Sequence, residues 1–392
     1  MSRHPFDRRD FLKTAVASTA AVTVLPQAAL GWSGKASGSH IETESVPGRA
    51  PYSGPPRLRF AVIGINHPHI DGQIGAVQRG GGELASVYAA EPELLAEFTK
   101  RYPQAKVARS EDEILQDGSI QLVLSSIIPD QRAPLGVRVM QHGKDYMADK
   151  PGITTLEQLA EVRRVQAQTK RIYSILYSER HENRATVRAG ELAKAGAIGK
   201  VVQTIGMGPH RISLNARPPW FWVKPRFGGI LCDIGSHQVD QFLYFTGSTQ
   251  GEVVASQVGN FKFSQYATFE DFGDMLLRGD KGTGYIRNDW YTPDGLSTWG
   301  DGRLTILGTE GYMEVRKNND IGRAPGGSHL YLVDQKETRY IDCSQQELPY
   351  GRLLVDDVLN RTETSMPQAH VFLAMELALK AEAQATKLTF RA

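Results

Sequence analysis

The feature that most constrains the fold of this chain is a regular alternation of apolar and amphipathic segments that begins at Leu58. The runs at residues 58–65 and 120–128 have the composition of strands buried on both faces of a sheet, and further strands are expected at 84–90 and 144–148. Amphipathic stretches of helical length separate them. The alternation predicts an α/β fold with a doubly wound parallel sheet in its N-terminal half. Ligands of such sheets bind at the carboxyl ends of the strands.

Helices are expected at residues 70–79, 93–101 and 134–142 within this half. Beyond it, short strands dominate from residue 252 to residue 339, and an amphipathic segment at 370–384 predicts a final helix. The chain has 392 residues, which is enough for two domains with cores of their own.

The N-terminal segment is expected to direct export and to lie outside the fold. Arg8 and Arg9 precede a Phe-Leu-Lys sequence and an apolar run at 14–25, which is too short to span a membrane. The pattern resembles a twin-arginine (Tat) signal, which implies that the Tat machinery carries the folded protein to the periplasm. The competing interpretation is a chance arginine pair before an alanine-rich helix. We expect a signal peptide at 1–31 and a flexible linker at 32–56.

Composition excludes several classes of function. The formal net charge is +2, and basic and acidic residues are interspersed, so no nucleic-acid surface is expected. No segment predicts a stable membrane association. Cys232 and Cys343 are far apart in the sequence, and no cysteine–histidine group has zinc-ligand spacing. The sequence therefore predicts no disulfide and no metal site built on cysteine.

The strongest chemical signal is the segment from Gly228 to Asp240, which reads Gly-Gly-Ile-Leu-Cys-Asp-Ile-Gly-Ser-His-Gln-Val-Asp. Asp233 and His237 lie four residues apart, so on a helix their side chains share one face. A carboxylate beside an imidazole suits proton transfer to or from a sugar-like hydroxyl, because histidine titrates near neutral pH. By itself, such a pair is more often a surface pair or a buried histidine with satisfied hydrogen bonds.

Together with Asp-Lys-Pro at 149–151, this segment resembles two motifs of the Gfo/Idh/MocA family, which includes glucose–fructose oxidoreductase and inositol dehydrogenase. That family carries Glu-Lys-Pro and Gly-Gly-x-x-x-Asp-x-Gly-x-His-x-x-Asp. The resemblance implies a Rossmann dinucleotide-binding domain at 57–151 and a C-terminal substrate and oligomerisation domain at 152–392. The second domain would hold a large, mainly antiparallel open sheet that forms homo-oligomer contacts. The helix at 370–384 would pack back toward the first domain.

The resemblance implies an exported NAD(P)-dependent oxidoreductase that transfers hydride between a nicotinamide and a sugar, polyol or keto-sugar derivative. The cofactor would carry the hydride chemistry. His237 would move the hydroxyl proton, Lys150 would polarise the same oxygen, and Asp233 would hold a neighbouring hydroxyl or orient His237. Further contacts with the carbohydrate substrate are expected from Arg180, His210 and Trp220.

The loop after the first strand departs from the dinucleotide fingerprint Gly-x-Gly-x-x-Gly. Residues 64–69 read Gly-Ile-Asn-His-Pro-His, so only the first glycine is kept. Asn66 tolerates a left-handed conformation, and the start of the following helix still offers backbone N–H groups to a pyrophosphate. The expected cofactor contacts are Gly64, Ile65, Asn66, His67, Glu91, Pro129 and Lys150.

Glu91, at the end of the second strand, favours NAD over NADP, because a carboxylate binds ribose hydroxyls and repels a 2′-phosphate. An exposed loop acid is the competing interpretation of Glu91, and NADP stays an alternative cofactor. His67, His69 and His210 stay open as substrate or metal contacts.

Two alternatives to net oxidation or reduction also stay open. A relative that keeps NAD bound through a redox-neutral cycle would act as a glycosidase or lyase. A non-catalytic sugar-binding protein on the same scaffold would tolerate the altered glycine loop.

Overall fold

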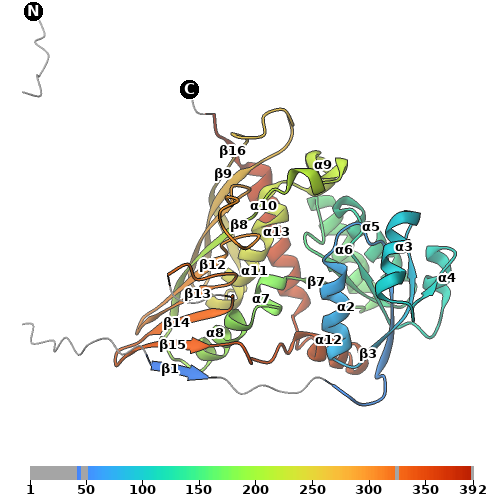
Figure 1. The fold of residues 1–392 in the computed structure, drawn as a ribbon, viewed down its shortest axis with the longest axis horizontal. Helices are drawn as coiled ribbons and strands as arrows, with labels where there is room; N and C mark the ends of the chain where they lie inside the picture. Colours follow the sequence, from blue (N-terminus) through green and yellow to red (C-terminus); the bar gives the residue numbers. More distant parts are fainter. Residues whose placement is uncertain (1–41, 46–51, 323–325, 390–392) are drawn as a thin grey trace, which may run out of the picture. The chain divides into compact units, whose positions relative to one another are not determined.

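The computed structural model describes residues 42–45, 52–322 and 326–389. The expected signal peptide, with Arg8 and Arg9, lies outside the described residues. Within them the fold is built from two sheets and their helices (Figure 1). No helix in these ranges is both long and apolar enough to cross a membrane.

The first sheet has six strands, all parallel, in the order β4-β3-β2-β5-β6-β7. The order reverses between β2 and β5, which is where ligands of doubly wound sheets bind. The strands are β2 (Leu58–Ile63), β3 (Gly82–Tyr88), β4 (Lys106–Val107), β5 (Leu122–Ser125), β6 (Asp145–Asp149) and β7 (Tyr173–Leu176). The helices between them are α2 (Ile70–Arg79), α3 (Pro92–Arg101), α4 (Glu111–Gln116), α5 (Pro129–Gln141) and α6 (Leu156–Thr169).

The second sheet has ten strands in the order β1-β15-β14-β13-β12-β8-β11-β10-β9-β16. Most neighbours are antiparallel, and the pairs β1–β15, β8–β11 and β9–β16 are parallel. Its strands are β1 (Glu42–Ser45), β8 (Val201–Pro209), β9 (Gly251–Gly259), β10 (Phe272–Gly279), β11 (Thr283–Asp289), β12 (Arg303–Gly308), β13 (Tyr312–Arg316), β14 (His329–Val333), β15 (Thr338–Asp342) and β16 (Thr386–Lys387).

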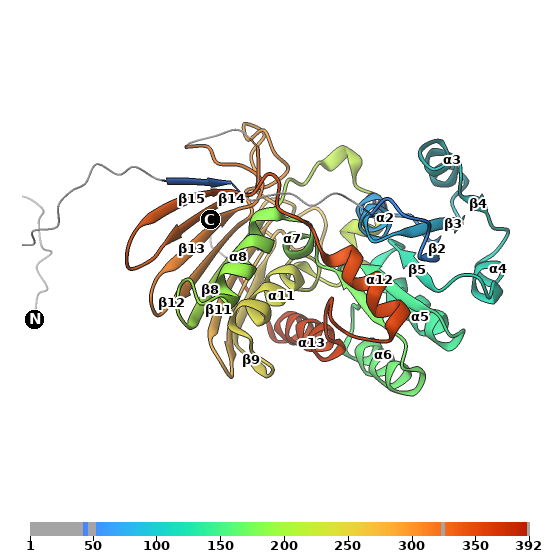
Figure 2. The ribbon, with the colours of Figure 1, turned by 90° about the horizontal axis from the view of Figure 1, so that it is seen from below.

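A layer of helices lies between the two sheets and covers one face of the larger one (Figures 1 and 2). The helices after β7 are α7 (Ser178–His181), α8 (Arg184–Lys194), α9 (Lys224–Phe227), α10 (Ile230–Asp233), α11 (Gly235–Thr246), α12 (Tyr350–Asn360) and α13 (Gln368–Gln384), with 3₁₀ turns at Leu214–Ala216 and Pro219–Trp222. The fold class expected from the sequence, a parallel doubly wound sheet followed by a mainly antiparallel one, is confirmed.

The contact between the two halves runs through β7 and α13. Strand β7 is the sixth strand of the parallel sheet, so this sheet continues past residue 151, where the sequence placed the domain boundary. Helix α13 packs against α6 and β7 as well as against α10 and α11. The backbone N–H of Tyr173 donates to Gln368 Oε1 at 2.9 Å. The last helix therefore joins the two halves.

Three local features differ from the sequence-based expectations. Strand β1 falls inside the segment expected to be a linker and pairs in parallel with β15. Strand β4 has only two residues, too few for a periodic pattern to show. Helix α5 begins at Pro129 rather than at residue 134. Proline is favoured at the first position of a helix, which Pro129 occupies, and the helix continues through Pro134.

A candidate active site between the two sheets

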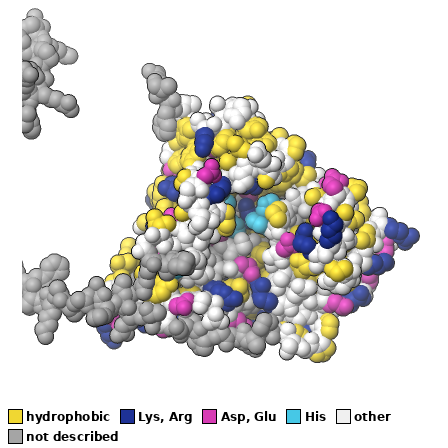
Figure 3. Space-filling view, in the orientation of Figure 1, with side chains coloured by type: hydrophobic (Ala, Val, Ile, Leu, Met, Phe, Trp, Pro, Cys, Tyr) yellow, Lys and Arg dark blue, Asp and Glu magenta, His cyan; other side chains and the backbone are white. Residues whose placement is uncertain are grey.

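A cleft of about 290 Å³ lies where the carboxyl end of the parallel sheet faces the helices of the second half. Histidine side chains gather in a hollow between the two halves (Figure 3). The cleft brings together all three residues expected to act in proton transfer, Lys150, Asp233 and His237. The position agrees with the rule for ligands of open α/β sheets.

Lys150 and Asp233 meet across the two halves of the protein. Lys150 follows the last residue of β6, and its Nζ donates to Asp233 Oδ1 at 2.9 Å. The two side chains are 6% and 10% exposed, so the pair is nearly dry. Burial opposes ionisation of Asp233, but the Lys150 ammonium outweighs it and lowers the pKa of Asp233. Asp233 is therefore ionised at neutral pH and holds the Lys150 ammonium in place.

The glycine pair in front of Asp233 explains how that residue is positioned. Gly228 and Gly229 have φ values of +91° and +92°, a region that other residues rarely adopt. A Cβ on Gly229 would lie 2.2 Å from the carboxyl carbon of Glu382. That carboxylate accepts a hydrogen bond from Leu231 N at 3.0 Å, at the start of α10. The two glycines thus let the chain turn tightly and anchor the short helix that ends at Asp233.

His237 lies in the first turn of α11, one turn beyond Asp233, with Ile234 between the two helices. The side chain is buried, and its Nδ1 has no hydrogen-bond partner among the described residues. Burial lowers the pKa of His237 to about 4. The Glu179 carboxylate raises this pKa and Lys150 lowers it, so the effect of burial prevails. The imidazole is therefore neutral at pH 7, with a ring nitrogen free of hydrogen bonds to the described residues.

Glu179 is a cleft residue that the sequence did not single out. It follows β7, at the same edge of the parallel sheet as Lys150. Its Oε2 accepts from Lys317 Nζ at 2.5 Å and from Gln238 Nε2 at 2.6 Å, whereas Oε1 has no partner among the described residues. Burial opposes ionisation, but Lys317 outweighs it and lowers the pKa of Glu179. Its place directly after an apolar strand was the signal that could have identified it.

Aromatic side chains form the wall opposite the parallel sheet. Trp220, Trp290 and Trp299 line the cleft together with His210, whose ring centroid lies 4.5 Å from that of Trp299. The Arg217 guanidinium lies 4.9 Å from the centroid of the Trp290 ring. Aromatic faces bind the C–H faces of sugars and leave hydroxyls free for polar neighbours. Two of the expected substrate residues, His210 and Trp220, therefore line the cleft.

Arg180, the third expected substrate residue, does not line this cleft. Its guanidinium makes two hydrogen bonds to the Asp240 carboxylate, at 2.6 and 2.7 Å. The guanidinium carbon of Arg180 lies 4.6 Å from the centroid of the Tyr244 ring. His370 Nε2 contacts the same carboxylate at 2.8 Å. The structure places this group beside a separate cavity of about 550 Å³ between α8, α11 and α12.

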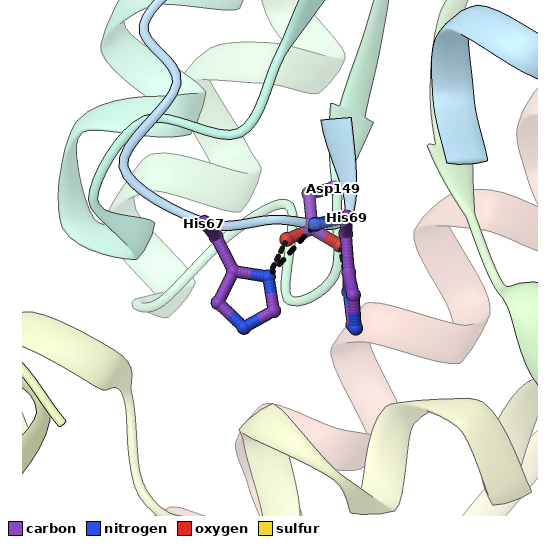
Figure 4. A group of neighbouring side chains, drawn as sticks. All are labelled: His67, His69 and Asp149. Carbon is purple, nitrogen blue, oxygen red and sulfur yellow. Dashed lines mark hydrogen bonds and ion pairs between the residues drawn. The ribbon is translucent and has the colours of Figure 1, made fainter. Parts of the chain in front are cut away.

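His67 and His69 lie at the Rossmann side of the cleft, on the loop after β2, and both approach the carboxylate of Asp149 (Figure 4). His67 Nδ1 is 3.2 Å from Asp149 Oδ2, and His69 Nδ1 is 2.9 Å from Oδ1. Burial lowers the pKa of His67 to about 4, with His69 adding to the effect. Burial opposes ionisation of Asp149, but Arg132 and the two histidines outweigh it and hold its pKa well below the usual range.

The residues at the carboxyl end of β2 and β3 fit a bound dinucleotide. Gly64 has a φ of +77°, and a Cβ there would lie 2.5 Å from Cβ of Ile127, so the turn requires glycine. No side chain caps the N-terminus of α2, which leaves its dipole facing the loop. Asn66 Nδ2 donates to Glu91 Oε1 at 2.7 Å, which holds that carboxylate at the end of β3. Of the expected cofactor residues, His67, Pro129 and Lys150 also line the cleft.

Two family models match this chain. The model described as the oxidoreductase family, NAD-binding Rossmann fold, matches residues 58–177, and the GFO/IDH/MocA C-terminal domain matches residues 186–314. A protein of Erwinia carotovora atroseptica, named only by class as an oxidoreductase, is 45% identical with a TM-score of 0.82. The alignment covers 85% of this chain and 100% of that one.

More distant similarities extend to enzymes with named substrates. A 1,5-anhydro-D-fructose reductase of Ensifer adhaerens is 25% identical over 205 residues, which is 50% of this chain and 59% of that protein. An aldose–aldose oxidoreductase of Caulobacter crescentus, solved with glycerol, shares the fold with a TM-score of 0.68 at 18% identity, covering 84% of this chain and 97% of that one. The chain spans about two fifths of the length of the curated relatives it matches first, two uncharacterised oxidoreductases of Schizosaccharomyces pombe.

Proposed function

Because this chain belongs to the GFO/IDH/MocA family of oxidoreductases, we propose that it transfers hydride between a nicotinamide dinucleotide and a CH–OH carbon of a sugar, polyol or keto-sugar derivative. One observation carries the proposal. Lys150 from the parallel sheet and Asp233 and His237 from the second half converge on one cleft, at the edge of the sheet where a dinucleotide binds. Its aromatic wall suits a carbohydrate ring.

The residues of the cleft divide the work of proton transfer. The bound nicotinamide supplies or accepts the hydride. In the oxidative direction the neutral imidazole of His237 accepts the proton of the substrate hydroxyl, and in the reductive direction it returns that proton. The Lys150 ammonium donates a hydrogen bond to the same oxygen and stabilises the negative charge that develops on it. Asp233 orients the ammonium through the 2.9 Å contact.

The remaining cleft residues support recognition of a polyhydroxylated substrate. The unpartnered Glu179 Oε1 is an acceptor for a substrate hydroxyl, and Lys317 and Gln238 hold the other oxygen in place. Trp290 and Trp299 supply the apolar surface against which a sugar ring packs. Glu91 supports a preference for NAD over NADP, because its carboxylate lies where ribose hydroxyls are bound in this fold.

A substrate screen tests the proposed reaction. The purified protein is incubated with a panel of aldoses, polyols and keto-sugars in the presence of NAD or NADH, and absorbance at 340 nm is read beside chromatography of the sugars. We expect a substrate-dependent change in absorbance matched by an oxidised or reduced sugar. Product formation without a net absorbance change would instead support the redox-neutral cycle, and no product from any class would support the binding protein.

We further propose that the protein is exported through the Tat machinery. Replacing Arg8 and Arg9 together by lysine should retain the protein in the cytoplasm, because Tat recognition depends on the arginine pair. Cell fractionation followed by immunoblotting measures the distribution. Arg3→Lys, outside the pair, is the matched control and should be delivered normally. Periplasmic delivery of the double variant would contradict the proposal.

We also propose that the uncovered face of the larger sheet joins two copies of this chain. Leu276, Tyr285 and Ile205 are exposed apolar residues on adjacent strands and are aligned in register across β10, β11 and β8. An apolar row of this kind on an open sheet face is typical of an interface. Ile205→Glu should shift the mass measured by light scattering after size-exclusion chromatography toward the monomer. Val107 is an exposed apolar residue of β4, outside this face, so Val107→Glu is the control and should keep the mass of the unaltered protein. Equal masses for the unaltered protein and both variants would contradict the interface.

A further inference from the structure

We propose that His67, His69 and Asp149 form a binding site for one divalent transition-metal ion of the Zn²⁺ class at the wall of the cleft. The inference goes beyond the proposed hydride transfer and does not depend on it. The two histidines stand in the loop where the dinucleotide fingerprint has lost its second and third glycines. After Gly64 this loop has no further glycine and carries two imidazole side chains.

The topology brings the three residues together from separate parts of the sequence. His67 and His69 follow β2, and Asp149 is the last residue of β6, so all three lie at the carboxyl edge of the parallel sheet. Both imidazoles project from the same loop beside the carboxylate (Figure 4). One ligand atom from each residue lies within 4.8 Å of the other two. The ring centroids are 4.1 Å apart with the planes at 86°, so the rings do not stack against each other.

The distances agree with a shared ion. A zinc ion binds imidazole nitrogen and carboxylate oxygen at about 2.0–2.2 Å, so two ligands of one tetrahedral ion lie roughly 3.3 Å apart. The observed separations are 3.2 Å from His67 Nδ1 to Asp149 Oδ2 and 2.9 Å from His69 Nδ1 to Asp149 Oδ1. Two atoms with acceptor lone pairs this close need a positive group between them, which is either a proton or a metal ion. The trio is thus a metal site or a pair of imidazole–carboxylate hydrogen bonds.

The surroundings of Asp149 favour a prepared ligand. Arg132 Nη2 donates to Oδ2 at 3.0 Å and the backbone N–H of Lys150 donates to Oδ1 at 2.7 Å, which fixes the plane of the carboxylate. Each oxygen keeps its remaining acceptor position on the side of a histidine. Hydrogen bonds that orient a ligating carboxylate are a regular feature of metal sites. The Arg132 guanidinium weakens cation binding, whereas the negative charge of the Asp149 carboxylate favours it.

The proposed site faces the reaction space. His67 and His69 line the same cleft as Asp233 and His237, whereas Asp149 lies behind them and is 2% exposed at its side chain. Two histidines and one carboxylate are the ligand set of zinc sites that keep a position open for water or substrate. An ion held here would present that open position to the cleft, where a substrate hydroxyl or carboxylate oxygen is its ligand.

The test measures metal binding directly, in the full-length protein and without reference to turnover. Protein freed of metal by a chelator, and carrying no affinity tag, is titrated calorimetrically with Zn²⁺, and dialysed protein is analysed by plasma mass spectrometry. We expect about one ion per chain. His69→Ala, whose side chain is 41% exposed and contributes little packing, should weaken binding by roughly 100-fold or more. Exposed His142, which bonds only its own helix, is the matched control, and His142→Ala should bind as the unaltered protein does.

A second readout separates a folding defect from the loss of a ligand. Co²⁺ should give visible absorption bands in the unaltered protein and in His142→Ala, and His69→Ala should lose them while melting at a similar temperature. The absence of stoichiometric binding, or equal affinity in His69→Ala and the unaltered protein, would overturn the proposal and leave the hydrogen-bonded trio. NAD binding by the metal-free protein, measured in the same preparation, shows whether the proposed function stands or falls separately.

Discussion

Replacing His237 with alanine is expected to lower kcat by roughly 10²–10⁴-fold, the contribution typical of a general acid or base. No other described imidazole combines a place in the cleft, a position one turn beyond Asp233 and a neutral state favoured by burial. The measurement is steady-state turnover on the substrate identified by the screen, with thermal unfolding of the same preparations. His370→Ala is the matched control. His370 contacts Asp240, which lies on the same helix as His237, but it does not line the cleft.

The pH dependence of the unaltered protein gives a second sign of the same role. The pKa of His237 is lowered to about 4, so the neutral form that accepts a proton predominates above that pH. In the oxidative direction kcat/KM should therefore stay level from neutral pH downward and fall as the pH drops through about 4. His237→Ala should lack this acid limb. Near-full turnover of the variant, or loss of activity explained by a much lower melting temperature, would contradict the assignment.

Removing Lys150 is expected to have the largest effect on stability. Lys150→Ala leaves the Asp233 carboxylate buried without its cation, and breaking a buried ion pair in this way costs about 3–5 kcal/mol in the free energy of unfolding. The variant should also lose turnover, because no other described cation bonds the Asp233 carboxylate in the cleft. The pair is buried and joins the two halves of the protein, so its loss should lower stability as well as turnover.

A double variant separates the two effects of Lys150. Lys150→Ala combined with Asp233→Ala removes both charges, so it should recover much of the stability lost in Lys150→Ala alone. It should stay inactive, because the oxygen of the substrate then has no ammonium beside it. Urea unfolding and kinetics on the four proteins of the cycle measure both quantities. A Lys150→Ala protein as stable as the unaltered one would show that the pair contributes nothing to holding the two halves together.

The parallel sheet was predictable because its central strands, such as β2 and β5, are continuous apolar runs between amphipathic helices. Strand β7 was expected as a strand, but its membership of the first sheet depends on pairing with β6, which no local pattern reveals. The two residues of β4 are both exposed and are too few to form a periodic pattern. Local periodicity thus predicts an element, whereas its place in a sheet depends on distant parts of the chain.

The site was predictable where a motif carries it. Asp233 and His237 follow from their spacing of four residues, although the structure places them on two successive helices, and Lys150 follows from its place at the end of a parallel strand. Trp299 was missed because it reaches the cleft only through tertiary packing, whereas Glu179 follows a buried strand and could have been identified from that position. Arg180 was expected at the mouth of the site, yet the neighbouring residue of the same short helix faces the cleft instead. In a single helical turn, adjacent side chains point in different directions, so an error of one position moves a residue out of a site.

The central claim is that the first sheet binds a nicotinamide dinucleotide against the cleft that holds Lys150, Asp233 and His237. The most direct measurement is the identity and amount of nucleotide bound by the purified protein. Absorbance and mass spectrometry of material released on denaturation are followed by calorimetric titration of the emptied protein with NAD and with NADP. We predict about one dinucleotide per chain, either retained on purification or bound on titration, with NAD preferred. No released nucleotide and no binding of either dinucleotide would contradict the account.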